Sequence, residues 1–505
     1  MKKMFILLTA VLALSLTACD KADNSSENIS GNNSEIGGEN SLSNSTGEST
    51  GSTEQNAPDM PSTGANPIML ANEDYPAHDW YSSFGTDDGI YNIKEAHSKE
   101  IGTYGYIMYT DYASGQEVYL CSDSSCNHNT ERCSSYLHNR DFIIGHEPRL
   151  FVYNNSLYYL SVSAVKDVNT ATITTGVPYE DDRPPRLYRM ELDGSNRELV
   201  YTFDKELGVL PFAAGDGNAL WFFVKTPTMS HDEERHVYFY ATKDPTLIKL
   251  DLSTRDIVEQ IPLYKYNDLE RISVWGCADG KIIFRGQELP EGMTREQINA
   301  EANFDDPNAD SLRVRELYKK FKSVYFTLDL NNKDIKEIYR HVYADEYTSF
   351  TDGKYAYLTN TEEMTSVRID IESGEQSEFY PAEGYVAIGM IGDKYNCRSV
   401  DKDDITSYFI DKQSGEMTSN SLEALYTDEH WGMYPDLFPE ERFYKPISKD
   451  VLAYSKDYVL ISSLQEYNSA DKYWVKETAV MSLDDYLNGI MNYRTVKSDF
   501  HHYRT

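Results

Sequence analysis

The chain has 505 residues and a formal net charge of −35, because its 82 acidic side chains outnumber its 47 lysines and arginines. This excess of negative charge argues against nucleic acid and against an anionic lipid surface as partners, and it favours solubility. Aromatic residues make up 13% of the chain, and 40 residues are tyrosine, a composition that suits half-buried strands and argues against a mainly helical protein.

Residues 1–18 have the layout of a secretory signal peptide. Lys2 and Lys3 precede an apolar run that ends at Leu16, well short of the ~20 apolar residues that a membrane-spanning helix needs. The sequence Leu-Thr-Ala-Cys follows and matches the lipobox of bacterial lipoproteins, in which the chain is cut before a cysteine that carries diacylglycerol. We therefore predict that the mature chain begins at Cys19 and that lipid on Cys19 holds it at the outer face of the cell membrane.

Residues 19–65 contain the lipidated cysteine and a segment rich in Ser, Asn, Gly, Glu and Thr. Almost no aromatic or branched apolar side chains occur there, so the segment cannot build a core and is expected to be disordered. A random coil of about 45 residues has an end-to-end distance of about 35–40 Å. This length suits a tether at a Gram-positive wall or on a crowded surface, and residues 66–505 are then the folded ectodomain.

Cys121, Cys126, His128 and Cys133 lie close together in the stretch CSDSSCNHNTERC. Three thiolates and an imidazole are the ligand set of a tetrahedral structural site, and the intervening Ser, Asp and Asn residues favour turns that could wrap an ion. Their spacing differs from that of the standard zinc fingers. The pattern predicts a structural zinc or iron ion held by these four residues.

A disulfide is the alternative for this cysteine cluster, because thiols often pair outside the cytosol. Three cysteines leave one over, which could pair with Cys277 or Cys397 if the fold brings them close. Otherwise these two are small buried hydrophobic residues in strands. Reduced thiols in an anaerobic habitat are a third possibility. A catalytic pairing of Cys126 with His128 lacks a third orienting group nearby.

A two-part pattern repeats through the remaining chain. Its first part is a turn rich in Asp, Asn and Gly that leads into an aromatic strand, as at residues 154–160, 216–222, 279–284 and 352–358. Its second part is an alternating strand that ends in a polar turn, as at residues 187–194, 247–252, 324–330, 367–371 and 408–411. An aspartate recurs at this second turn, where its carboxylate can accept hydrogen bonds from the amides of the turn.

The repeat predicts an all-β fold, a β-propeller. Its units recur every ~40–60 residues, as expected when each unit is one four-stranded blade. Unit starts fall near seven residues, which gives about seven blades, with six or eight allowed: Asp88, Asn155, Asp216, Asp279, Asp352, Asp393 and Asp457. A short helical insertion is expected in the fourth blade near residues 289–322, where Thr294 and Gln297 form a capping pair.

The phrase LYRMELDGSNRELV, residues 187–200, and its weaker copies resemble the TolB-like and WD40-like propellers of lipoproteins in clostridia and their relatives. The resemblance covers residues 85–498 and implies blade geometry and a surface binding or scaffolding role, without a reaction. A similar group of cysteines and a histidine near the first blade is also expected from these lipoproteins.

The function expected from these features is binding. The propeller would present loops to a protein, peptide or glycan partner, and no catalytic residue is predicted. An enzyme that acts on extracellular carbohydrate or peptide, with carboxylates and tyrosines at the mouth of the channel, is the alternative, and a structural role in the envelope is a third. The acidic chain is too rich in carboxylates for a catalytic pair to be picked out by sequence.

Overall fold

The computed structural model describes residues 67–71, 83–98, 102–128, 132–138, 148–161, 173–174, 184–232, 237–266, 269–294, 297–298, 319–342, 347–361, 363–401, 404, 406–420, 451–468, 473–490 and 492–500. All of them belong to one compact unit, Gly64–Trp431 with Tyr444–Thr505. The predicted signal peptide, Cys19, the tether and most of the helical insertion lie outside the described residues. Among the described helices, none has the length and hydropathy needed to cross a membrane.

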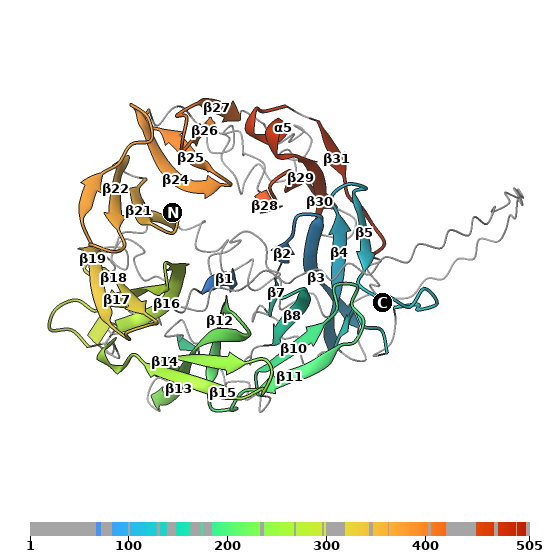
Figure 1. Cartoon of the computed structure of the whole chain (residues 1–505), viewed down its shortest axis with the longest axis horizontal. Coiled ribbons are helices and arrows are strands. Elements are labelled where there is room, and N and C mark those ends of the chain that lie inside the picture. The colour runs from blue at the N-terminus through green and yellow to red at the C-terminus, as the bar shows by residue number, and fades with distance from the viewer. Residues whose placement is uncertain are drawn as a thin grey trace, which may run out of the picture. The chain divides into compact units, whose positions relative to one another are not determined.

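Seven sheets follow one another along the chain and form the blades of a β-propeller (Figure 1). Each blade has four antiparallel strands in chain order from its inner to its outer edge. The first three blades are blade 1, β2 (Ser83–Gly85), β3 (Gly89–Ser98), β4 (Gly102–Asp111) and β5 (Gln116–Tyr119); blade 2, β7 (Arg149–Tyr153), β8 (Ser156–Ser161), β10 (Arg186–Met190) and β11 (Glu198–Thr202); and blade 3, β12 (Gly208–Asp216), β13 (Ala219–Asp232), β14 (Val237–Asp251) and β15 (Ile257–Pro262).

In the part of the chain that the structure describes, the remaining four blades repeat this plan without added strands. They are blade 4, β16 (Leu269–Ala278), β17 (Lys281–Glu288), β18 (Lys322–Asp329) and β19 (Ile335–Val342); blade 5, β20 (Tyr347–Thr351), β21 (Tyr355–Asn360), β22 (Thr365–Asp370) and β23 (Gln376–Glu378); blade 6, β24 (Tyr385–Ile391), β25 (Lys394–Ser399), β26 (Ser407–Asp411) and β27 (Met417–Asn420); and blade 7, β28 (Val451–Tyr454), β29 (Tyr458–Asn468), β30 (Tyr473–Ser482) and β31 (Tyr493–Thr495).

Four short strands extend blades 1 and 3. β1 (Ile68–Ala71) pairs with the inner strand β12 and lies towards the middle of the ring in Figure 1, and β9 (Ile173–Thr174) pairs with β14. β6 (Tyr136–Leu137) pairs with β4, and β32 (Lys497–Ser498), near the C-terminus, pairs in parallel with β5. Two helices lie wholly within the described residues: a 3₁₀ turn, η1 (Tyr264–Tyr266), and α5 (Leu483–Leu487), which Ser482 caps by accepting a hydrogen bond from the amide of Asp485.

The seven predicted turns each fall in a different blade, and each connects that blade's first and second strands. A blade therefore begins one strand before the point at which the sequence pattern placed it. The turn between β7 and β8 illustrates the sequence requirement, because Asn154 and Asn155 have φ angles of 46° and 56°. These are left-handed values that asparagine tolerates better than most residues and that suit a two-residue hairpin turn.

The aspartates at the end of the third strands hydrogen-bond to the following turn, as predicted. In blade 5 the Oδ1 atom of Asp370 accepts hydrogen bonds from the amides of Glu372 and Ser373, at 3.1 and 2.8 Å. Asp251, Asp329 and Asp411 accept the equivalent bonds in blades 3, 4 and 6. The recurrence of this aspartate therefore has a structural cause, since it fixes the turn to the fourth strand.

Hydrophobic clusters fill the spaces between neighbouring blades and close the ring. Six of them join consecutive blades, from Ile107 and Tyr159 between blades 1 and 2 to Phe409 and Ile461 between blades 6 and 7. A seventh cluster, which contains Ile90 and Leu460, packs blade 7 against blade 1. Burial of these faces is the main stabilising contribution and explains why a single blade would not be stable alone.

The predicted capping pair at the start of the helical insertion is confirmed. Gln297 Oε1 accepts a hydrogen bond from the amide of Thr294 at 2.8 Å, and Thr294 Oγ1 accepts one from the amide of Gln297 at 3.3 Å. This reciprocal arrangement is a capping box, and residues 297–298 are helical. Residues 299–318 of the expected insertion lie outside the described residues.

Candidate metal centre

The four predicted ligands lie in an interruption of the outer strand of blade 1. β5 pairs with β4 at Met108–Thr110, whereas β6 pairs with β4 at Gly105 and Tyr106, so the two short strands occupy the same edge of β4. Residues 120–135 connect them and are called the cysteine loop below. Because the loop leaves and rejoins the same edge, its two ends are held close together.

Ile107 of β4 fixes both ends of the cysteine loop. Its carbonyl oxygen accepts a hydrogen bond from the amide of Leu120 at 3.0 Å, and its amide donates to the carbonyl oxygen of Ser135 at 2.9 Å. The hydroxyl of Ser135, which is fully buried, also donates to the Ile107 carbonyl oxygen at 2.7 Å. Inside the loop, Asp123 Oδ1 accepts a hydrogen bond from the amide of Ser125 at 2.9 Å and forms a tight turn.

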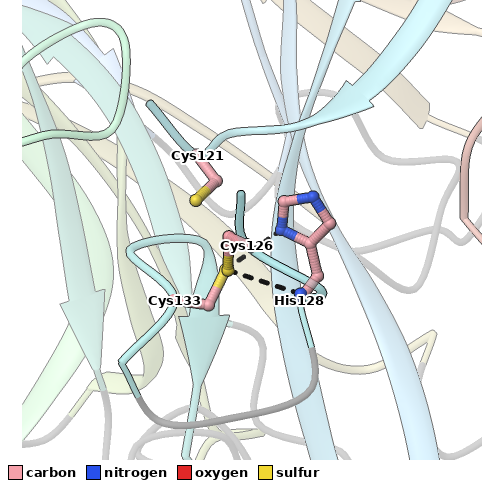
Figure 2. Close-up of side chains that lie close together, drawn as sticks. All are labelled: Cys121, Cys126, His128 and Cys133. Carbon is pink, nitrogen blue, oxygen red and sulfur yellow. Dashed lines mark hydrogen bonds between the residues drawn. The ribbon is translucent and has the colours of Figure 1, made fainter. Parts of the chain in front are cut away.

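The side chains of Cys121, Cys126, His128 and Cys133 point towards one another (Figure 2). One potential ligand atom from each residue lies within 4.8 Å of the other three, and His128 Nδ1 lies 3.4 Å from Cys133 Sγ. In a tetrahedral zinc site with Zn–S bonds of about 2.3 Å, neighbouring ligand atoms are about 3.5–4 Å apart. The cluster therefore needs only a small contraction to enclose an ion of this size.

Tyr119 and the backbone of His128 set the orientation of the imidazole. The backbone of His128 is left-handed, with a φ angle of 55°, and its amide approaches Cys126 Sγ at 3.4 Å. The imidazole stacks on the ring of Tyr119, with 4.2 Å between centroids and 13° between planes. This contact was not predicted from the sequence; the position of Tyr119 directly before the cysteine loop was the available signal.

A group of aromatic residues lies beneath the cluster. Cys133 is 3% exposed and packs with Tyr104, Tyr106 and Tyr136, whereas the other three ligand residues are partly exposed. Phe500 follows the C-terminal strand β32, and its ring lies 6.1 Å from the rings of Tyr106 and Tyr119. The candidate centre is thus in contact with the C-terminal segment. The sequence did not predict this contact, because the two segments are far apart in the chain.

The protonation states of the ligands differ. Burial raises the pKa of the Cys133 thiol to about 12. Burial also raises the pKa of Cys121, but hydrogen bonds from the Asp123 backbone and the Ser134 side chain outweigh it, so this pKa is lowered overall. Burial lowers the pKa of His128 and thereby favours the neutral imidazole that binds metal. An ion would release the thiol proton of Cys133, so its affinity should rise with pH.

The other two described cysteines are far from this cluster in the fold. Cys277 lies in β16 and Cys397 in β25, where each packs against a hydrophobic cluster between blades. Burial raises the pKa of both thiols to about 12. All five described cysteines are free thiols, and Cys277 and Cys397 behave as small hydrophobic residues rather than as partners for the cysteine loop.

The ligand set determines what this centre can do. Three thiols and one imidazole could hold one metal ion with four protein ligands. Zinc sites that are closed in this way are structural, because catalytic sites keep a position for water or substrate. An ion here would join both ends of the interrupted outer strand of blade 1 and would be a cross-link within the blade.

Comparisons with known proteins give the fold context. No protein-family model and no curated protein matches the chain. Similar solved structures include Pyrococcus horikoshii acylaminoacyl peptidase, at 8% identity and a TM-score of 0.41 over 85% of this chain and 54% of that chain. The β-propeller domain of the Trilobed protease from Pyrococcus furiosus has 7% identity and a TM-score of 0.39 over 83% of this chain and 98% of that domain.

TolB from Acinetobacter baumannii is also similar, at 11% identity and a TM-score of 0.29 over 84% of this chain and 81% of that chain. The chain spans about half the length of the acylaminoacyl peptidase, 54% of it. These likenesses are distant, and the assignment of a propeller rests on the strand order and on the clusters between blades.

Proposed function

We propose that this chain is a lipoprotein of the outer face of a Gram-positive membrane, whose propeller is a binding or scaffolding module for a protein, peptide or glycan. The predicted lipid on Cys19 would anchor it, and residues 20–65 would hold the propeller away from the lipid. The cysteine loop would carry one structural zinc or iron ion. A propeller alone specifies no reaction, so the proposal rests on particular contacts.

The binding role is supported by two extended segments of this chain that pair with the edges of blades. β1 adds to the inner edge of β12, with Ile68 opposite Gly215, and β32 adds to the outer edge of β5. Strand addition of this kind is a common mode of peptide recognition, in which backbone hydrogen bonds supply affinity. The ring is closed by a hydrophobic cluster between blades 7 and 1, which provides a rigid platform for such pairing.

Several buried or partly buried carboxylates are engaged in structural contacts. Glu117 is buried and forms an ion pair with Lys94, and Asp216 accepts a hydrogen bond from Lys249 at 2.7 Å. Each of these pairs joins strands within one blade, which favours a structural use of the carboxylate. These contacts support a scaffold, and no observation favours the enzyme over the binding module.

Two measurements test this proposal. Metabolic labelling with a clickable fatty acid should label the wild-type chain and leave the Cys19→Ser variant unlabelled, and label retained by the variant would refute the anchor. The purified chain should then be incubated with a panel of peptides and glycans while bound and consumed ligand are both measured. Retention without consumption supports a binding module. Turnover that a single carboxylate substitution abolishes would replace it with the enzyme.

A further inference from the structure

A pocket of about 650 Å³ lies where the cysteine loop of blade 1 meets the outer strands of blade 2. Five residues within 132–138 form one wall, and residues of β10 and β11 form the other together with Arg197, which directly precedes β11. The side chains used in the following argument are Arg132, Tyr136, His138, Arg186, Tyr188 and Arg197. The pocket adjoins the candidate metal centre, because Cys133 belongs to both.

Among the described residues that line this pocket, basic side chains outnumber acidic ones. Three arginines line it, in a chain whose formal net charge is −35. Glu198 is the acidic residue in the lining, and its carboxylate is already engaged by two other arginines: its Oε1 atom accepts a hydrogen bond from Arg189 Nε at 3.1 Å, and its Oε2 atom accepts one from Arg255 Nη2 at 2.7 Å. Glu198 is therefore already paired with arginines outside the lining, rather than with Arg132 or Arg197.

Arg197 is held in place before any ligand arrives. Its Nη1 atom donates a hydrogen bond to the carbonyl oxygen of Tyr136 at 2.6 Å, across the boundary between the two blades. The guanidinium lies over the ring of Tyr188, 4.8 Å from the centroid. Arg186 Nη1 donates to the hydroxyl of the same Tyr188 at 3.4 Å. Such fixed arginines lose less conformational entropy when they bind an anion than mobile side chains would.

We propose that this pocket binds an oxyanion group, a carboxylate or a phosphate ester, carried by a small polar ligand. The inference rests on the binding role proposed above and names the ligand chemistry. The planar guanidinium offers parallel N–H donors that match the two oxygens of a carboxylate or phosphate. The volume lies within the range of roughly 300–1,000 Å³ found for small-molecule sites. The lining supplies charge and hydrogen-bond donors, which suits an anionic ligand better than an apolar one.

Calorimetric titration of the full chain, purified in detergent, tests this pocket. The probes are inorganic phosphate and digalacturonate, which carries carboxylates. A neutral digalactoside is the matched control. At least one anion should bind saturably and the neutral sugar should not. Affinity should fall as ionic strength rises, since the interaction is between charges that salt screens.

Two variants assign the binding to the pocket. Arg132 is exposed on the cysteine loop, so Arg132→Gln should fold normally and should weaken anion binding about tenfold, as should Arg197→Gln. Arg368→Gln is the matched control in blade 5, because Arg368 lies over the ring of Tyr355 at 4.6 Å and does not line the pocket. This control removes the same charge and the same type of ring contact, and it should bind like the wild type.

The outcomes separate the ligand sources and the two proposals. Binding of phosphate identifies a phosphate ester as the recognised group, and binding of digalacturonate identifies a carboxylate. Failure of both anions to bind, or unchanged binding in Arg132→Gln and Arg197→Gln, would overturn the proposal that this pocket binds an oxyanion. If the chain still retains peptides or glycans from the panel in that case, the binding module stands and only the oxyanion site is lost.

Discussion

Blades 1 and 5 are built to the same plan but differ in how that plan is completed. Blade 5 contains β20, β21, β22 and β23 in simple order. Blade 1 has a fourth strand that is split into β5 and β6, and the cysteine loop fills the gap. It also receives β32 from the end of the chain. Of these two blades, blade 1 therefore carries the candidate metal centre, one wall of the arginine-lined pocket and the pairing with the C-terminal strand.

The difference reflects where each blade finds its stabilising contacts. In blade 5, Asp352 accepts hydrogen bonds from the amides of Lys354 and Tyr355, two and three residues away. In blade 1, Glu117 accepts a hydrogen bond from Ser498, 381 residues away. The contacts of aspartates with their own turns recur in several blades, whereas the contact of Glu117 with Ser498 joins blade 1 to the end of the chain. This teaches that departures from the repeat are the places to look for function.

The largest expected effect lies in the regular blade. Tyr357 of β21 is 1% exposed and stacks on Phe350 with 4.6 Å between centroids, so Tyr357→Ala should lower the free energy of unfolding by about 3–5 kcal/mol. Tyr357→Phe keeps the ring and removes the hydroxyl bonds to Asp352 and Tyr395, so it should cost about 1–2 kcal/mol. Urea unfolding measures both. Equal losses would contradict the importance of the buried ring.

An intermediate effect is expected at the ring closure. Glu117 is 2% exposed and accepts hydrogen bonds from Lys94, Ser498 and, at 3.1 Å, Asn92. Glu117→Ala should lower the free energy of unfolding by about 1–3 kcal/mol, because it leaves these donors without their acceptor. The same variant should expose the C-terminal strand to limited proteolysis. A variant that is destabilised but equally resistant at its C-terminus would show that Glu117 does not hold the closure.

The smallest effect concerns the pH dependence of blade 5. Burial alone would raise the pKa of Asp352, but hydrogen bonds from the Lys412 side chain, the Tyr355 backbone and the Tyr357 hydroxyl lower it overall. A carboxyl whose pKa is lowered on folding stabilises the protein above its unfolded pKa of about 3.9, and this contribution disappears as the pH falls through the folded pKa.

Asp352→Asn removes this titration. The wild type should therefore lose more stability than Asp352→Asn between about pH 4 and pH 2. Thermal unfolding across this range measures the difference. Parallel losses in the two proteins would contradict the assigned role of Asp352. An Asp393→Asn variant serves as the control, because Asp393 is exposed in the turn between β24 and β25.

The regular features were accessible from sequence because their signals are local. The turns at Asp216, Asp279 and Asp352 and the alternating strands after them predicted one blade each, and the structure confirms seven blades. The clustering of Cys121, Cys126, His128 and Cys133 was also predictable, since they lie within one short stretch. In each of these cases, the residues that define the feature are also neighbours in the chain.

The missed features depend on distant residues. The tilted ring contact between Phe500 and Tyr119 and the pairing of β32 with β5 join the two ends of the propeller, and neither has a periodic signal in the sequence. β6 has two residues, too few to show an alternating pattern. The arginine-lined pocket could not be predicted from the sequence, because Arg132 and Arg197 come from different blades and meet only when the blades pack together. Such juxtapositions follow from the closed ring and become visible only in three dimensions.

The central claim is that an ion cross-links the interrupted strand of blade 1. The most direct measurement combines elemental mass spectrometry with thiol titration after unfolding, on the full chain purified in detergent without added metal or reductant. We expect about one zinc or iron ion per chain and all five thiols of the described cysteines free, with the ion lost in His128→Ala. No bound metal and about three free thiols would mean that a disulfide occupies the cysteine loop, and would contradict the claim.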